Sequence, residues 1–187
     1  MKMNRFQFAV LVAACVVTVL LRVRNMPMHL DSMIALTLLC GALVRHPAAI
    51  LLPLALRVLT DVVLWYGNGT AFYPSIVLEC YVPYLLIAVL ARHAPAPGYA
   101  KMIAGMLLGP FLFFALSNLS VWFLWPQTYA PTFAGLINCY TAGLPYLRHS
   151  IAGNLPFAVL LLAAWHVATV WNSTSLPVAS ADSGNDG

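Results

Sequence analysis

Apolar positions in this chain form long blocks, and short segments between them carry most of the charges, prolines and glycines. A helix rises about 1.5 Å per residue, so about 20 apolar residues cross a hydrocarbon core of about 30 Å. The pattern therefore predicts six membrane-spanning helices, of which the second is short, at residues 6–21, 32–44, 47–66, 72–91, 102–125 and 150–171.

The segment before the last predicted helix has a different character. Residues 126–146 contain three prolines and two glycines, which interrupt regular helix. We therefore expect an irregular or re-entrant segment here, which membrane depth tolerates only where the backbone packs in protein or faces water. Residues 102–147 contain no charged residue and are together long enough for two spans, so a seven-span alternative stays open.

The composition places the whole domain in a membrane. Of the 187 residues, 62% are hydrophobic and 7% are charged, against roughly 25% charged in an ordinary soluble domain. The net charge of +4 comes from scattered basic residues, which excludes nucleic-acid binding as the main role. We predict an all-α, polytopic transmembrane helix bundle in a lipid bilayer, formed as a single domain by residues 1–171. Residues 172–187 are polar and are predicted to be a disordered tail.

The basic residues indicate an orientation. Six spans place both termini on one side, where five basic residues fall, against three on the other: Lys2, Arg5, Arg45, Arg92 and Lys101 against Arg22, Arg24 and Arg148. The positive-inside rule then predicts a multi-pass protein of the cell inner membrane with cytoplasmic termini. Residues 12–15 also resemble a bacterial lipoprotein cleavage box, but the apolar run continues to Arg22, which favours an uncleaved helix.

Three charged residues fall inside predicted spans, where a charge needs a partner or a function. Arg57 and Asp61 are four residues apart and share a helical face. They form either a structural ion pair or half of a polar binding site. Glu79 has no neighbouring cation in the sequence. Its partner is expected on another helix, for example Arg57, or it lies near a water-filled cavity.

Polar and aromatic residues gather in the second half of the chain. Asn118 and Trp122 share a helical face, where they either hydrogen-bond to a neighbouring helix or hold a small polar molecule. The connections opposite the termini hold further polar residues, so we expect a binding cavity open to that side. The candidate ligand-binding residues are Asp61, Glu79, Asn118, Trp122, Tyr129, Asn138, Tyr140 and Arg148.

Motifs for catalysis or cofactors do not occur in the sequence. The five histidines lack metal-ligand spacing, and no nucleophile motif or phosphate-binding glycine loop is present. We therefore expect no metal and no cofactor, no use of ATP by this chain itself, and a function that is not enzymatic.

Five short segments carry a resemblance to a known family. They are residues 113–122, 129–132, 135–136, 139–146 and 153–154. These segments resemble the signature of a family of small bacterial integral membrane proteins of unknown function. Residues 53–56 with 60–61 resemble its earlier motif, and residues 25–36 resemble it more loosely, so the resemblance covers roughly residues 25–160. Two positions depart from it: Met33 stands where a proline is expected, and Asn154 where an aspartate is usual.

The size and layout of that family are similar to those of the substrate-binding subunits of energy-coupling factor transporters. This likeness implies about six helices, an outward-facing site for a small solute, and partnership with a transmembrane scaffold and ATPase subunits. The leading hypothesis is therefore a solute-binding or transport subunit whose solute is unknown. A membrane assembly protein and an intramembrane lipid-modifying enzyme remain as alternatives.

Overall fold

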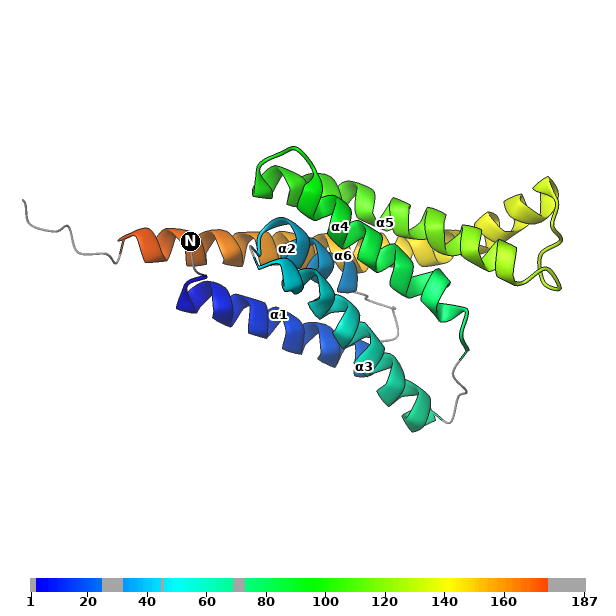
Figure 1. The fold of residues 1–187 in the computed structure, drawn as a ribbon, viewed down its shortest axis with the longest axis horizontal. Helices are drawn as coiled ribbons and strands as arrows, with labels where there is room; N and C mark the ends of the chain where they lie inside the picture. The colour runs from blue at the N-terminus through cyan, green and yellow to red at the C-terminus, as the bar shows by residue number, and fades with distance from the viewer. Residues whose placement is uncertain (1–2, 25–31, 45, 69–72, 175–187) are drawn as a thin grey trace, which may run out of the picture.

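The computed structural model describes residues 3–24, 32–44, 46–68 and 73–174, and all regular elements in these ranges are helical (Figure 1). The all-α prediction is thus confirmed for this part of the chain. The predicted tail lies outside the described residues from residue 175 onward. The elements are α1 (Arg5–Val23), α2 (Met33–Ala42), the 3-10 turn η1 (Pro47–Ile50), α3 (Leu51–Asn68), the π-helical turn η2 (Val77–Tyr81), α4 (Val82–His93), α5 (Gly98–Leu124) and α6 (Phe133–Thr174).

The six α-helices run in alternating directions, so the start of α1 and the end of α6 lie at the same end of the bundle (Figure 1). Side-chain contacts tie these two helix ends together. Asn4 Nδ2 donates to the carbonyl of Ala168 at 2.8 Å, and Gln7 Nε2 donates to Thr169 Oγ1 at 3.1 Å. Asn4 and Gln7 also form a capping box that satisfies the first backbone N–H groups of α1. We call this end of the bundle the terminal end.

The core of the bundle is built around the shortest α-helix. α2 contacts each of the other five α-helices, and every residue from Ser32 to Gly41 is buried. A close approach to α4 explains Gly41, because a Cβ there would lie 2.6 Å from the backbone oxygen of Ala88. With 10 residues α2 is about 15 Å long, about half of a hydrocarbon core, and the number of spans therefore stays a prediction.

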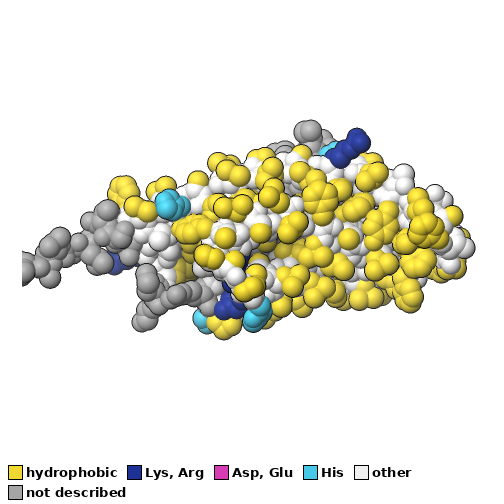
Figure 2. Space-filling model, turned by 90° about the horizontal axis from the view of Figure 1, so that it is seen from above, with side chains coloured by type: hydrophobic (Ala, Val, Ile, Leu, Met, Phe, Trp, Pro, Cys, Tyr) yellow, Lys and Arg dark blue, Asp and Glu magenta, His cyan; other side chains and the backbone are white. Residues whose placement is uncertain are grey.

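Among the described residues, four helices are long and apolar enough to cross a membrane: Arg5–Val23, Pro47–Gly67, Gly98–Leu124 and Phe133–Trp171. Their outer faces are strongly apolar, as Figure 2 shows for one side of the molecule. Large apolar side chains such as Leu108 on α5 (65% exposed) and Leu160 on α6 (67%) point away from the protein. Such a surface needs lipid around it, which supports the predicted bilayer environment.

The segment predicted to be irregular is shorter than its prolines and glycines suggest. Irregular backbone is confined to residues 125–132, and from Phe133 one helix continues to Thr174 through Pro145 and Pro156. The prediction of irregular backbone was therefore wrong for residues 133–146. Re-entry of this segment into the membrane stays a prediction. Membrane helices tolerate proline because neighbouring groups satisfy the freed carbonyls.

The glycines of α6 permit close contacts rather than ending the helix. A Cβ on Gly135 would lie 2.0 Å from the oxygen of Ala130, and one on Gly143 would lie 2.4 Å from Oδ1 of Asn118 on α5. Thr132 begins the helix, because its Oγ1 accepts the backbone N–H of Gly135 at 3.1 Å. These residues fold the turn back and bring α6 against α5.

Candidate functional site

The candidate site is a cluster of two arginines, one aspartate and two tyrosines, contributed by α1, α3, η2 and α4. We call it the arginine–aspartate cluster: Arg22, Arg57, Asp61, Tyr81 and Tyr84. Asp61 lies at its centre and is 3% exposed. Its Oδ1 accepts a hydrogen bond from Nη2 of Arg22. Its Oδ2 accepts one from Nε of Arg57 at 3.0 Å and one from the hydroxyl of Tyr81 at 3.1 Å.

Arg57 is held on several sides at once. Its guanidinium donates to the hydroxyl of Tyr84 at 3.4 Å and contacts the sulfur of Cys80 at 3.7 Å. It also lies over the ring of Tyr84, with Cζ 5.4 Å from the ring centroid. Such a cation–π contact stabilises a charge that is only 8% exposed. The pair predicted from the four-residue spacing of Arg57 and Asp61 is present.

Arg22 has a different environment from Arg57. One terminal nitrogen pairs with Asp61, but Nε is buried and has no hydrogen-bond partner among the described residues. A buried donor without an acceptor is costly, and such a group in a native protein indicates an additional water, ion or ligand. The unsatisfied Nε therefore marks the side of the cluster at which an acceptor fits.

The local structure of η2 positions Tyr81 for this site. Pro83 lacks a backbone N–H, so the carbonyl of Glu79 loses its regular partner four residues later. The helix widens into a π-turn here, with the N–H of Val82 bonded to the carbonyl of Val77. Turns of this kind are frequent at functional sites. The extra residue in the turn aims Tyr81 at Asp61 on α3.

Glu79 comes from the same π-turn but is not part of the cluster. Its Oε1 accepts the indole N–H of Trp125 at 2.8 Å, next to the end of α5. Ser120 reinforces this contact, since its hydroxyl donates to the carbonyl of Leu78 at 3.1 Å. The partner of Glu79 on another helix is thus the indole of Trp125, and its suggested pairing with Arg57 stays a prediction.

Asn118 and Trp122 both lie where α5 contacts the irregular segment and α6. Asn118 donates to the carbonyl of Phe114 at 2.8 Å, and its own backbone oxygen accepts the thiol of Cys139 at 3.4 Å. Trp122 donates from Nε1 to the carbonyl of Ala130 at 3.0 Å, which pins the irregular segment. In the described structure both residues make interhelical or loop contacts.

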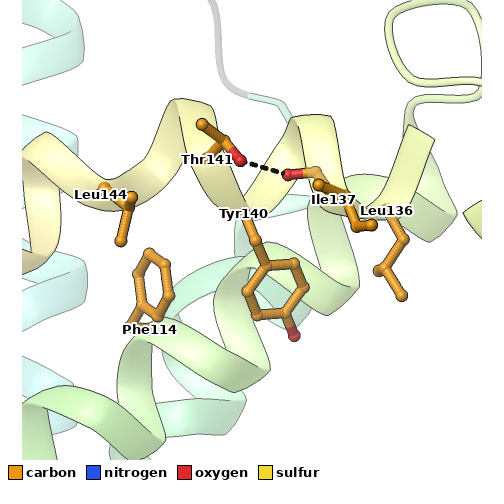
Figure 3. Close-up of a pocket in the computed structure, with 6 residues that line it drawn as sticks. All are labelled: Phe114, Leu136, Ile137, Tyr140, Thr141 and Leu144. Atoms are coloured by element: carbon orange, nitrogen blue, oxygen red, sulfur yellow. Dashed lines mark hydrogen bonds between the residues drawn. The ribbon is translucent and has the colours of Figure 1, made fainter. Parts of the chain in front are cut away.

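Tyr140 lines an apolar cavity of about 420 Å³ between α5 and α6 (Figure 3). Its hydroxyl donates to the carbonyl of Ala115 at 2.6 Å, and its ring packs edge-on against Phe114. Thr141 on the same wall donates to the carbonyl of Ile137 at 2.7 Å. With these hydroxyls already bonded, the cavity is an apolar depression and offers little to orient a polar solute.

The remaining predicted ligand contacts are spread over α6 and the turn before it. Tyr129 is half-buried in the irregular segment, whereas Asn138 and Arg148 are exposed on α6. Among the described residues, no hydrogen bond connects these three, or Asn118, Trp122 and Tyr140, with Asp61. The grouping of the eight candidates in one ligand site stays a prediction.

Four residues near the centre of the bundle were not among the site residues predicted from the sequence. Arg22, Tyr81 and Tyr84 belong to the cluster, and Asn154 on α6 accepts the backbone N–H of Ala35 in the first turn of α2 at 3.1 Å. Asn154 is 2% exposed. Arg22 had a weak signal, because it adjoins an apolar span, but the same position suits an interfacial anchor.

The chain belongs to a family of unknown function (DUF6580), whose model matches residues 2–176. No curated protein and no solved structure matches the chain.

Proposed function

We propose that this membrane protein binds a small solute with an acidic group at the arginine–aspartate cluster. The observation that carries the proposal is the buried Nε of Arg22, which has no hydrogen-bond partner in the part of the chain that the structure describes. A carboxylate or phosphate oxygen of the solute supplies the missing acceptor. Arginine suits this role because its planar fork can bind Asp61 on one edge and an oxyanion on another.

The charge and burial of the cluster favour an acid over a neutral solute. Asp61 takes hydrogen bonds from both arginines, so one carboxylate faces two guanidinium groups. Isolated charges are expensive in a membrane interior, which favours a second negative group near the pair. A bound acid would complete the site by accepting the N–H of Arg22.

The proposed topology directs the site away from the termini. We keep the six-span topology as part of this proposal, and the positive-inside rule then predicts that the terminal end faces the cytoplasm. Asp61 lies in the second half of α3, and Arg22 lies in the last turn of α1. Both positions are nearer the opposite end, from which we expect the solute to enter.

Transport of the solute would require other subunits. The sequence has no phosphate-binding loop, so energy from ATP has to come from partner ATPases acting through a transmembrane scaffold. This arrangement is the one implied by the likeness to energy-coupling factor subunits. Fold-level likeness is weaker support than the site, so we rank solute binding above transport.

The test is purification of the tagged protein from its own host in mild detergent, with mass spectrometry of bound small molecules and proteins. We expect a carboxylate- or phosphate-bearing compound in the wild type and a roughly ten-fold lower amount in Arg22→Lys, because a charge-assisted hydrogen bond is lost. Lysine keeps the positive charge beside Asp61, so this variant should fold. Arg5→Gln is the matched control, since Arg5 is exposed on the same helix.

The possible results separate the proposal from its alternatives. Equal ligand content in Arg22→Lys and wild type would remove the site, and loss of ligand in Trp122→Ala instead would move it to α5 and α6. Recovery of an ATPase pair and scaffold would extend the proposal to transport. Recovery of membrane partners without any small molecule would favour an assembly role, and a lipid product lost on gene deletion would favour an enzyme.

A further inference from the structure

A second site lies on the outer face of α4 and α5 at the terminal end. The two helices leave a groove with a cavity of about 230 Å³, whose floor includes Leu38 of α2. Its walls are mostly small residues, among them Ala91, Ala104 and Gly105. A Cβ on Gly105 would lie 2.3 Å from Leu38, so glycine keeps α5 close to α2.

Basic side chains lie where this groove ends. Lys101 lines the groove, and its ammonium donates to the carbonyl of Arg92 at 2.8 Å. Arg92 in turn donates to the carbonyls of Val44 at 3.3 Å and His46 at 3.4 Å. A carbonyl carries no net charge, so the contact with the Arg92 carbonyl positions the ammonium of Lys101 without neutralising it. Figure 2 shows basic and histidine side chains gathered in small groups at the margin of an otherwise apolar face.

The described carboxylates lie elsewhere. Asp61 is engaged by arginines in the cluster, and Glu79 binds Trp125. Trp125 follows the last residue of α5, and Lys101 lies in its first turn, so about 36 Å of helix separates them. The charge of Lys101 is therefore open to an anion from outside the described chain.

We infer that the α4–α5 groove binds an anionic phospholipid, with an acyl chain in the groove and the phosphate against Lys101. An apolar slot on a membrane-facing surface accepts a lipid chain, and a basic group at its end selects for a negatively charged headgroup. Basic pockets between membrane helices are known to hold such headgroups. The inference does not depend on the proposed solute site, since the two share no residue.

The inference predicts lipid selectivity. The protein is reconstituted in nanodiscs with equal amounts of phosphatidylglycerol and phosphatidylcholine of the same acyl chains, then released into mild detergent for native mass spectrometry. We expect the wild type to retain phosphatidylglycerol ~5-fold over phosphatidylcholine, as one surface charge implies. Lys101→Gln should abolish this preference, and the control Arg5→Gln, which removes a charge at the same end, should keep it.

A second variant tests the groove itself. Ala104→Trp fills the slot from an exposed position and should lower the retained lipid several-fold. Val16→Trp on α1, where valine is 50% exposed, adds the same bulk on another helix and should have no effect. Equal retention of both lipids by the wild type overturns the inference. So does wild-type retention in either Lys101→Gln or Ala104→Trp.

Discussion

The part of the bundle around α2 and the far part of the α5–α6 pair are stabilised in different ways. Around α2, the entire stretch from Ser32 to Gly41 is buried in protein. In the far part, residues 111–150, large side chains such as Phe123 (75% exposed), Phe133 (76%) and Tyr146 (68%) face outward. The first region folds by packing helix against helix, whereas the second depends on lipid as its apolar surroundings.

The polar groups of the two regions differ in the same way. The arginine–aspartate cluster joins three charged groups from α1 and α3. The far region uses neutral hydrogen bonds to backbone carbonyls, such as those of Trp122 and Tyr140. Buried charges are costly to leave without a partner, while a neutral bond is worth little in net terms. Substitutions of polar residues should therefore lower the free energy of unfolding much more near the cluster than in the far region.

The largest expected effect is that of Asp61→Asn. It removes the negative charge between Arg22 and Arg57, and breaking a buried pair in this way costs about 3–5 kcal/mol. The free energy of unfolding is measured by denaturing-detergent titration. Glu79→Gln is the matched control, because Glu79 contacts the neutral Trp125, and it should cost less than ~1.5 kcal/mol. Equal losses in the two variants would contradict the comparison.

Added methyl groups test the packing of the two regions. Gly41→Ala places a Cβ 2.6 Å from a backbone oxygen of α4, so the helices must separate, at a cost of about 1–3 kcal/mol. Gly143→Ala meets the side chain of Asn118, which can rotate, and should cost less. Thermal unfolding in detergent ranks the variants. Gly67→Ala, with nothing within 4 Å, is the control and should not destabilise the protein.

The smallest expected effect is in the irregular segment. Trp122→Phe removes the hydrogen bond to Ala130 and should cost about 0.5–1.5 kcal/mol. Because the loss is local, amide hydrogen exchange over residues 125–132 should accelerate while exchange in α2 stays the same. Phe123→Leu, an exposed neighbour on α5, should leave both rates unchanged. Faster exchange throughout the bundle would show that the two regions are not independent.

Local patterns predicted two of the five residues of the arginine–aspartate cluster. The four-residue spacing of Arg57 and Asp61 placed both on one face, and the structure pairs them. The patch of Asn118 and Trp122 was found for the same reason. Its contacts could not be predicted, because they depend on the way in which α6 returns along α5. The glycines of α6 were misleading, since a glycine required for close packing looks the same in sequence as one that ends a helix.

Helical class and a membrane environment follow from the sequence alone, because both depend on the length and apolarity of continuous segments. The pairing of Arg22 with Asp61 and the capping of α2 by Asn154 were decided only by the tertiary structure. These contacts join residues 39 and 119 positions apart. Which distant side chains meet is set by how the helices pack around the short α2, and no local periodicity carries that information.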